Sequence, residues 1–436
     1  MSHGIQTPNT GLIREVRALQ PAQGRASSTP SAKGISWIFG LGIALAAGSF
    51  AAWKTLAFWS VEDRNASILV ILTALVSTVI HVIFRRIERY PLVHRLRARF
   101  FSISIALLAV IFVLAFARLY YSRSFLLVFF VASLGWMLFE ERLTGRRRNM
   151  RLGMVPGGDS AVLKRLSLDL IELRTPELPQ GVDGLVVDLH ATLSEAWLRL
   201  LANCSLRNIP IFHSAVVYEG LTGRMSLGHL TPELVMELRV SPVYLLFKQW
   251  LEIAAILLLS PIILLVMLAV AIAIRLDSQG AVFFWQERVG QGETIFQMLK
   301  FRTMVPNADF AGAQFAHESD TRVTRIGKFL RKYRLDELPQ LWNVLKGEMS
   351  IVGPRPEQKA FVTRFNTEIP FYSCRHIVKP GITGWSQVTV GYAADHDSTR
   401  NKLEHDLFYI KNFSLSLDLI VVFKTIRTIL TGFGSR

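Results

Sequence analysis

This chain of 436 residues contains few cysteines and little charge. Its only two cysteines, Cys204 and Cys374, lie far apart, which excludes a disulfide scaffold and weakly favours a reducing compartment. Charged residues make up 19% of the chain, below the roughly 25% of a typical soluble domain, whereas 51% of the residues are hydrophobic. A chain this apolar is not disordered over most of its length, and its excess apolar residues must lie in a core or in a membrane.

Acidic residues are also scarce, because 33 Asp and Glu stand against 49 Lys and Arg and leave a net charge of +16. Such an excess of positive charge favours the binding of nucleic acid, anionic lipid or phosphorylated substrates. We expect no nucleic acid partner, because no nucleic-acid-binding motif occurs and much of the positive charge flanks apolar segments.

Four apolar stretches follow residues 1–33, which are rich in Ser, Pro and Gly and are predicted to form a flexible tail without a signal peptide. Buried helices of a soluble protein would keep a polar face, which these stretches lack, and three of them approach the ~20 residues that span a bilayer. We therefore predict a four-helix transmembrane bundle within residues 34–150. The stretches are residues 35–53, 66–84, 101–117 and 125–139.

Arginines indicate the orientation of this bundle. They concentrate between the second and third stretches and after the fourth, and the two other loops carry fewer. Because cytoplasmic loops are enriched in Lys and Arg, both ends of the bundle are predicted to face the cytoplasm. The arginines of these segments are Arg85, Arg86, Arg89, Arg95, Arg97 and Arg99, followed by Arg142, Arg146, Arg147, Arg148 and Arg151.

Residues 151–242 differ in composition, and we predict a small, truncated Rossmann-like α/β domain there. Short apolar runs at residues 184–190 and 209–212 are typical of buried strands, and the helical pattern between them favours parallel pairing. The GGD sequence that begins at Gly157 does not match a dinucleotide-binding loop, so we favour a packing or regulatory role.

A fifth apolar run, residues 250–274, contains Ser260 and Pro261 near its middle. Proline inside a helix removes a backbone hydrogen bond and kinks the helix. The run is therefore either a kinked transmembrane span or a helix that enters the membrane, bends at Pro261 and returns to the same face. Its length does not distinguish the two.

Polar motifs crowd residues 276–436, and the adjacent carboxylates of Asp336 and Glu337 lie among them. Pro339 and a helical apolar spacing follow, so Asp336 is predicted at or near a helix N-cap, where the helix dipole favours an ionised carboxylate. Such a carboxylate can act as a nucleophile or bind a metal ion. The alternative is a plain capping pair.

Seven cations accompany this pair in turn-rich motifs. Arginine binds phosphate oxygens bidentately, and Pro354 and Pro356 restrict the backbone on both sides of Arg355. The cluster could bind a diphosphate whose negative charge a divalent cation partly neutralises. The alternative is a solvated basic surface near anionic lipid, and the two can hold for different members of the cluster. The seven are Lys300, Arg302, Arg322, Arg325, Arg331, Arg334 and Arg355.

Residues 415–430 place apolar side chains at helical spacing and charges on the other faces. This pattern predicts an amphipathic helix. The helix either lies in the membrane interface or packs on the protein core, and the pattern favours neither.

Residues from about 244 to the end resemble the bacterial sugar transferases that act on polyprenyl phosphate, the monotopic phosphoglycosyl transferases. The resemblance rests on KFRTM, on LRKYRLDELPQLWNVLKGEMSIVGPRP and on KPGITGW. With its four spans and small α/β domain, the chain resembles the long form of the family, which initiates exopolysaccharide or O-antigen synthesis. The resemblance implies a mainly helical catalytic domain at residues 243–436, with a re-entrant membrane helix at residues 248–275 that is broken at Ser260 and Pro261.

The resemblance also implies a reaction, in which a hexose-1-phosphate passes from a UDP-sugar to undecaprenyl phosphate at the cytoplasmic face of the bacterial inner membrane. Asp336 would attack the β-phosphate and form a covalent phosphosugar intermediate. Glu337 would stand beside it, and both carboxylates would belong to a Mg²⁺ site. The cations expected to bind the substrate phosphates are Lys300, Arg302, Arg331 and Arg355.

Two departures from the family pattern limit what can be carried over. The family usually has Lys-Arg-x-x-Asp before the helix break, whereas this chain has Lys248, Gln249 and Glu252, so the family's anchoring ion pairs are not inferred. Many relatives also have Gly-Arg-Asn after GW-x-Q-V, where this chain continues with Thr389 and Val390. A contact of that arginine with the sugar nucleotide is therefore not inferred either.

Two rival functions fit the sequence less well. A catalytically inactive membrane scaffold for polysaccharide assembly is the main alternative, and the presence of Asp336, Glu337, Lys300 and Arg355 argues against it. A transporter is disfavoured because the four spans contain few ionisable residues. The expected partners are therefore a UDP-sugar, undecaprenyl phosphate and membrane lipids, while the sugar and the formation of a homo-oligomer stay open.

Overall fold

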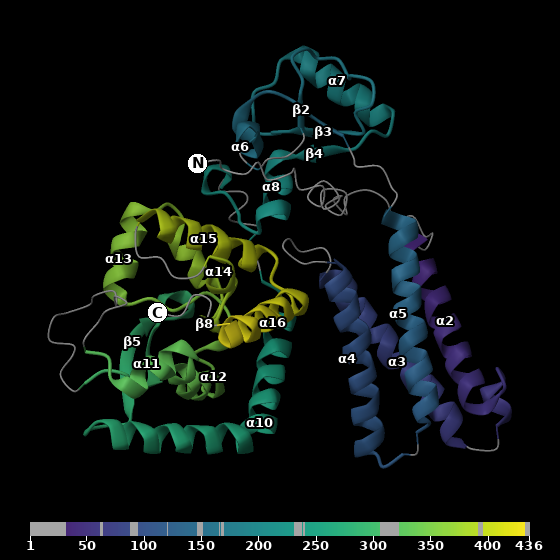
Figure 1. Cartoon of the computed structure of the whole chain (residues 1–436). Helices are drawn as coiled ribbons and strands as arrows, with labels where there is room; N and C mark the ends of the chain where they lie inside the picture. The colour runs from purple at the N-terminus through teal and green to yellow at the C-terminus, as the bar shows by residue number, and fades with distance from the viewer. Residues whose placement is uncertain are drawn as a thin grey trace, which may run out of the picture. The chain divides into compact units, whose positions relative to one another are not determined.

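We describe the protein from a computed structural model. The structure describes residues 32–431 except residues 62–63, 88–94, 120, 146–150, 165, 167–169, 231–237, 239, 306–321 and 391–395. The tail predicted at residues 1–33 lies almost wholly outside the described residues. The chain forms two compact units, Met1–Thr222 and Gly223–Arg436, and each is described by itself (Figure 1).

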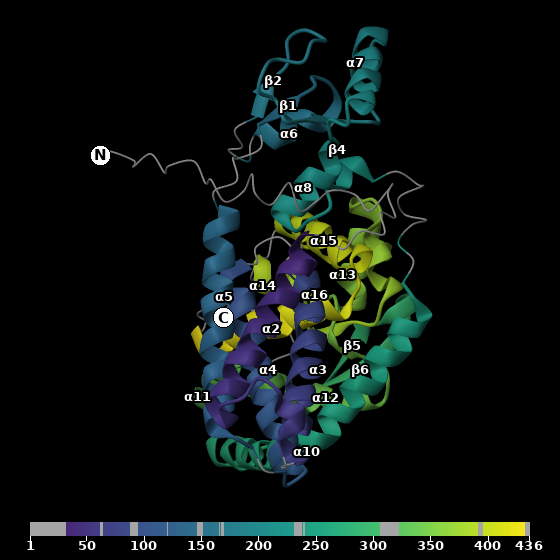
Figure 2. The same ribbon diagram turned by 90° about the vertical axis from the view of Figure 1, so that its right-hand side faces the viewer.

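Four long helices begin the first unit, where the four-helix bundle was predicted. Helix α2 packs mainly against α5, and α3 packs against α4 (Figures 1 and 2). The approach of α2 to α5 requires Gly40, because a Cβ atom there would lie 2.2 Å from Cδ1 of Trp136. The helices are α2 (Ala32–Trp53), α3 (Arg64–Ile87), α4 (Arg95–Phe116) and α5 (Arg123–Gly145).

Four helices of the described chain are long and apolar enough to span a membrane. Three of them, α2, α3 and α5, belong to the bundle, and the fourth is α10 (Pro242–Asp277) of the second unit. The apolar part of α4 is shorter, Ser102–Phe116, because Arg95, Arg97 and Arg99 occupy its first turns. The bundle is therefore four helices as predicted, three of which have the full spanning length.

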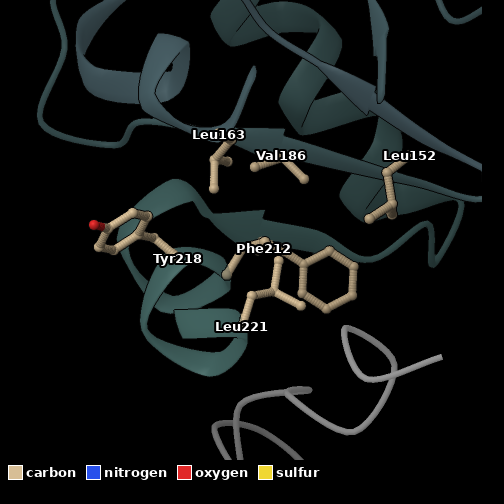
Figure 3. Packing of buried hydrophobic residues seen from close by; sticks show 7 residues of the cluster. Leu152, Leu163, Val186, Phe212, Tyr218 and Leu221 are labelled. Atoms are coloured by element: carbon tan, nitrogen blue, oxygen red, sulfur yellow. The ribbon is translucent and has the colours of Figure 1, made fainter. Parts of the chain in front are cut away.

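A four-stranded parallel sheet follows the bundle, with strand order β2-β1-β3-β4, which confirms the predicted parallel pairing. Its central strand β3 is completely buried because its side chains alternate between two apolar clusters. Val186 packs with α8 residues such as Tyr218 and Leu221 on one face (Figure 3), and Leu185 packs near α7 on the other. The elements are β1 (Leu152–Met154), α6 (Ala161–Lys164), β2 (Leu170–Glu172), β3 (Gly184–Val187), α7 (Glu195–Leu206), β4 (Ile211–His213) and α8 (Ser214–Thr222).

Helix α10 is 36 residues long and contains Pro261. Proline has no N–H to donate, and the hydroxyl of Ser260 instead donates to the carbonyl of Leu257 at 2.7 Å. In Figure 1 the helix has two limbs that run in different directions. Residues of both limbs pack on the same strand, since Ile256 contacts the cluster of Phe296 and Ile274 the cluster of Phe301.

The rest of the second unit is mainly helical and contains two small sheets. Strands β5 and β6 form an antiparallel hairpin, and β7 pairs with β8 in parallel. The elements are β5 (Phe283–Val289), β6 (Ile295–Phe301), α11 (Arg325–Lys332), α12 (Leu341–Leu345), β7 (Ser350–Val352), α13 (Lys359–Glu368), β8 (Gly381–Thr383), α14 (Trp385–Thr389), α15 (His396–Lys411) and α16 (Leu415–Thr431). Its short 3₁₀ helices are η4 (Leu227–His229), η5 (Gln291–Glu293), η7 (Leu335–Gln340) and η8 (Tyr372–Ile377), and those of the first unit are η2 (Phe58–Ser60) and η3 (Gly158–Ser160).

The amphipathic pattern at residues 415–430 corresponds to α16. This helix buries Leu417, Ile420 and Val421 in the second unit and leaves Phe423 and Ile426 about half exposed. One face of the helix therefore packs on the protein core, which was one of the two predicted alternatives. Its outer face keeps apolar side chains exposed.

A buried ammonium group joins α10 to β7 and α16. Nζ of Lys248 lies 2.7 Å from Oδ2 of Asp418, donates to the carbonyl of Val352 at 2.7 Å and donates to the hydroxyl of Tyr409 at 2.9 Å. The carboxylate of Glu252 accepts hydrogen bonds from two β7 residues, the hydroxyl of Ser350 at 2.7 Å and the backbone amide of Ile351 at 3.1 Å. Lys248, which matches the family pattern, thus anchors the membrane helix to Asp418, and Glu252, which departs from the pattern, anchors it to β7.

We predict that the second unit loses stability in mild acid through His405. Burial lowers the pKa of His405 from 6.5 to about 4, and Nδ1 of the neutral ring faces the carbonyl of Asn401 at 2.8 Å. Because the unfolded chain binds this proton near pH 6.5, the stabilisation is complete above that pH and declines as the pH falls toward 4. The loss reaches about 2 kcal/mol between pH 7 and pH 5.

The measurement is the thermal midpoint of the detergent-solubilised protein at pH 7.5 and pH 5. The drop in midpoint should be smaller in a His405→Gln variant than in the wild-type protein. Equal drops in the two proteins would contradict the assignment to His405.

Candidate active site

Three segments far apart in sequence bring the predicted site residues together. Strand β6 carries Lys300, η7 carries Asp336 and Glu337 in its first turn, and Arg355 follows β7. Strand β6 packs against η7. Arg334 separates α11 from η7 with a left-handed φ of 53°, and this reversal turns the two carboxylates toward β6. The predicted position of Asp336 near a helix start is correct, although the helix begins as a 3₁₀ turn that leads into α12.

Glu337 is buried and surrounded by cations. Its Oε1 atom accepts a hydrogen bond from Nη2 of Arg355 at 2.8 Å and lies 3.8 Å from Nζ of Lys300. Its Oε2 atom lies 3.8 Å from Nη1 of Arg334. Both oxygens of this carboxylate are therefore engaged by positive charge.

Asp336 is half-buried next to Glu337 but is not engaged in the same way. Within the described part of the chain, its carboxylate accepts no hydrogen bond and forms no ion pair of 4 Å or less, although Lys300, Arg355 and Arg331 act on it through their charge. Among these residues, no donor therefore competes with a bound group for its oxygens.

The two carboxylates have opposite pKa shifts. Burial alone would raise the pKa of Glu337, but Arg355, Lys300 and Arg334 outweigh it and lower the pKa to about 2. Burial, followed by the negative charge of Glu337, raises the pKa of Asp336 to about 6. Burial and the charge of Arg355 lower the pKa of Lys300 to about 8. At neutral pH Glu337 is thus a fixed anion, while Asp336 is ionised but considerably more basic.

Two other predicted cations have protein partners in this structure. Nη2 of Arg302 donates to both the carbonyl and the hydroxyl of Ser278, each at 2.8 Å, and Ser278 is the C-cap of α10. Nε of Arg331 donates to the hydroxyl of Thr303 at 3.0 Å. Arg331 still contributes positive charge at Asp336, whereas the guanidinium of Arg302 is held at the end of the membrane helix.

The loop that carries Arg355 is held by its backbone carbonyls. Five of the six carbonyls in residues 352–357 accept a hydrogen bond from outside the loop. The acceptors are Val352, Pro354, Arg355, Pro356 and Glu357, and their donors are Lys248, Gly381, Arg375, Arg288 and Val289. Gly353 completes this packing, because a Cβ atom there would lie 2.4 Å from the carbonyl oxygen of Lys379.

Three residues behind this loop were not found from the sequence. Arg375 and Asp406 form a buried ion pair at 2.9 Å, and Lys402 lies close enough for its pKa to be lowered by burial and by the charges of Arg375 and Arg355. Arg375 stands in a mostly apolar stretch just before KPGITGW, which could have indicated a buried role. Asp406 and Lys402 lie in the polar helix α15, where no pattern distinguishes them from surface residues.

Asp336 and Glu337 supply carboxylate oxygens, the donor type that Mg²⁺ binds. No group of three or more potential metal ligands occurs among the described residues. Mg²⁺ is, however, usually held by one or two carboxylates together with substrate phosphates rather than by an all-protein cage. In the described part of the chain, Asp336 offers oxygens that accept no hydrogen bond, and the negative charge of Glu337 lies beside them.

These features define a class of protein. Buried carboxylates within a cluster of cations, on a unit attached to a membrane-length helix, are expected of an enzyme that transfers phosphoryl groups near a lipid surface. The family model for bacterial sugar transferases matches residues 243–432, the part of the chain that contains the site.

Three relatives agree with this match. A UDP-N-acetylgalactosamine-undecaprenyl-phosphate N-acetylgalactosaminephosphotransferase of Aeromonas hydrophila is 48% identical over 329 residues, which are 74% of this chain and 77% of that protein. A UDP-glucose:undecaprenyl-phosphate glucose-1-phosphate transferase of Xanthomonas campestris is 46% identical over 37% of this chain and 34% of that protein. A transferase of the same name from Caulobacter vibrioides is 40% identical over 42% of this chain and 70% of that protein. The chain belongs to the bacterial sugar transferase family, and it is a membrane protein and an enzyme of that family.

We predict that Arg302 acts mainly by holding the end of α10. Replacing Arg302 with Lys removes the paired hydrogen bonds to Ser278 and should destabilise the second unit by about 1–3 kcal/mol. The measurement is thermal unfolding in detergent, with Arg364→Lys in the exposed Arg364–Glu368 pair as a control that should change little. Unchanged stability combined with weaker binding of a phosphorylated substrate would instead assign Arg302 to the substrate.

Proposed function

We propose that this protein transfers a hexose-1-phosphate from a UDP-sugar to undecaprenyl phosphate through a covalent intermediate on Asp336. The proposal rests on the different environments of two adjacent carboxylates. Cations engage both oxygens of Glu337, whereas the oxygens of Asp336 accept no hydrogen bond among the described residues. The relatives named above are transferases of this type, which supports the same substrate classes here.

In the first step, a carboxylate oxygen of Asp336 attacks the β-phosphorus of the UDP-sugar. The bond from this phosphorus to the bridging oxygen breaks, and UMP leaves with the electron pair. A raised pKa makes Asp336 a stronger nucleophile while leaving it ionised at neutral pH. Lys300 and Arg355, which flank Glu337, are positioned to stabilise charge on the transferred phosphoryl oxygens.

In the second step, a phosphate oxygen of undecaprenyl phosphate attacks the phosphorus of the aspartyl-phosphosugar. The bond between phosphorus and the Asp336 oxygen breaks, which restores the carboxylate and yields the sugar linked through diphosphate to undecaprenol. Mg²⁺ held by Asp336 and Glu337 would partly neutralise the charge of the diphosphate. The product is suited to initiate exopolysaccharide or O-antigen synthesis.

We also infer that α10 enters the cytoplasmic leaflet of the inner membrane and returns to the same side. Three observations support this topology: Pro261 lies within the helix, Ser260 hydrogen-bonds the carbonyl that the proline leaves free, and both limbs pack on β6. The arginine distribution of the bundle supports cytoplasmic ends. The second unit would then meet its UDP-sugar in the cytoplasm and its lipid phosphate at the headgroup level.

We expect wild-type enzyme mixed with a UDP-sugar and no lipid acceptor to release up to one UMP per active site, with the sugar phosphate retained on Asp336. Asp336→Asn should release none, because it removes the nucleophile. Asp336→Glu should release UMP about 10²-fold more slowly, because the carboxylate is displaced by more than 1 Å. Mass spectrometry of peptides detects the adduct, and a panel of UDP-N-acetylgalactosamine, UDP-glucose and UDP-galactose identifies the donor.

Glu368→Gln, in an exposed ion pair on α13, is the matched carboxylate control and should release UMP like the wild type. Direct attack by the lipid phosphate would give another pattern. UMP would then appear only after undecaprenyl phosphate is added, and no adduct would form on Asp336.

A cysteine-labelling experiment tests the topology of α10. With Cys204 and Cys374 replaced by Ser, a cysteine at exposed Leu56, in the loop between α2 and α3, should react with a membrane-impermeant maleimide in intact spheroplasts. A cysteine at exposed Thr363 on α13 should react only after lysis. Labelling of Thr363→Cys in intact spheroplasts would mean that α10 crosses the membrane completely.

A further inference from the structure

The backbone of Arg355 has a buried guanidinium as its partner. Nη2 of Arg375 donates to the carbonyl oxygen of Arg355 at 2.9 Å, while the side chain of Arg355 extends to Glu337. We propose that Arg375 is a positioning residue, which fixes the Arg355 guanidinium against Glu337 and the transferred phosphate. This proposal rests on the function proposed above.

Arg375 is itself fixed from several directions. Its Nη2 also contacts Oδ2 of Asp406 at 2.9 Å, and its Nη1 donates to the hydroxyl of Tyr372 at 2.6 Å. The other oxygen of Asp406 accepts from the hydroxyl of Ser386 at 2.7 Å. A planar guanidinium can serve a carboxylate, a hydroxyl and a carbonyl at once, which the single ammonium of lysine cannot reproduce.

The contacts of Arg375 indicate an indirect role. Its side chain is buried, and its hydrogen bonds go to Tyr372, Asp406 and the carbonyl of Arg355 rather than to Asp336. The peptide that it holds lies between Pro354 and Pro356, whose φ angles are already restricted by their rings. Fixing the intervening carbonyl removes much of the remaining freedom of Arg355, so the guanidinium is directed before the substrate arrives.

The kinetic test uses Arg375→Lys in the full-length enzyme and in an Arg355→Lys background. We expect Arg375→Lys alone to lower kcat by 10- to 100-fold, with KM for the UDP-sugar changed less than 3-fold, because misplacement near 1 Å costs about 10²-fold. In the Arg355→Lys background the same change should lower kcat by less than 3-fold, because the group to be positioned is already altered. Asp406→Asn, a milder change, should follow the same pattern with a smaller loss.

A structural test is independent of activity. Hydrogen–deuterium exchange of the detergent-solubilised protein should accelerate in Arg375→Lys for the peptide containing residues 352–357 and stay unchanged for the β5–β6 hairpin. Arg364→Lys, whose partner Glu368 is exposed on α13, should alter neither exchange nor kcat.

Equal loss of kcat in both Arg355 backgrounds, or unchanged exchange in residues 352–357, would overturn the positioning role. Loss of cooperative thermal unfolding in both Arg375→Lys and Asp406→Asn would also overturn it and assign the pair to global stability. If the wild-type enzyme releases no UMP from any UDP-sugar, the proposed function fails instead, and the exchange experiment still decides whether Arg375 holds the loop.

Discussion

The buried ammonium of Lys248 is the constraint on which the second unit depends. It neutralises Asp418 of α16, holds the carbonyl of Val352 at the end of β7 and contacts the hydroxyl of Tyr409 on α15. A charge buried in this way is strongly destabilising once a partner is lost, by about 3–5 kcal/mol. One group on the membrane helix therefore ties two helices and a strand together. Since Val352 leads directly into the Arg355 loop, the membrane attachment and the site share one rigid connection.

The chemistry of the site follows from an asymmetry between neighbours. Arg355, Lys300 and Arg334 surround Glu337, while burial, followed by the negative charge of Glu337, raises the pKa of Asp336. Without Glu337, burial alone would oppose these cations, and the pKa of Asp336 would be lower. The two carboxylates thus have different surroundings: cations engage both oxygens of Glu337, whereas those of Asp336 accept no hydrogen bond from the described residues.

The sequence predicted the elements whose signals are local. The apolar helices, the parallel strands of the α/β domain and the carboxylates at a helix start all follow from periodicity and capping patterns. Partners distant in the sequence could not be predicted in this way. The guanidinium of Arg302 binds Ser278 although its motif resembles a phosphate site, and Glu252 finds its partners on β7. The Arg375–Asp406 ion pair could not be predicted from the sequence, because only the fold brings η8 and α15 together.

The close approach of Gly353 and Gly381 has a consequence for how family members are recognised. A Cβ atom on Gly381 would lie 2.1 Å from the backbone nitrogen of Gly353, so these glycines are required by backbone packing and not by the reaction. Selection for folding alone would keep them in a descendant that had lost its nucleophile. Gly353 and Gly381 therefore report an intact scaffold, and inactive descendants are to be sought among sequences that retain both glycines but have replaced the residue corresponding to Asp336.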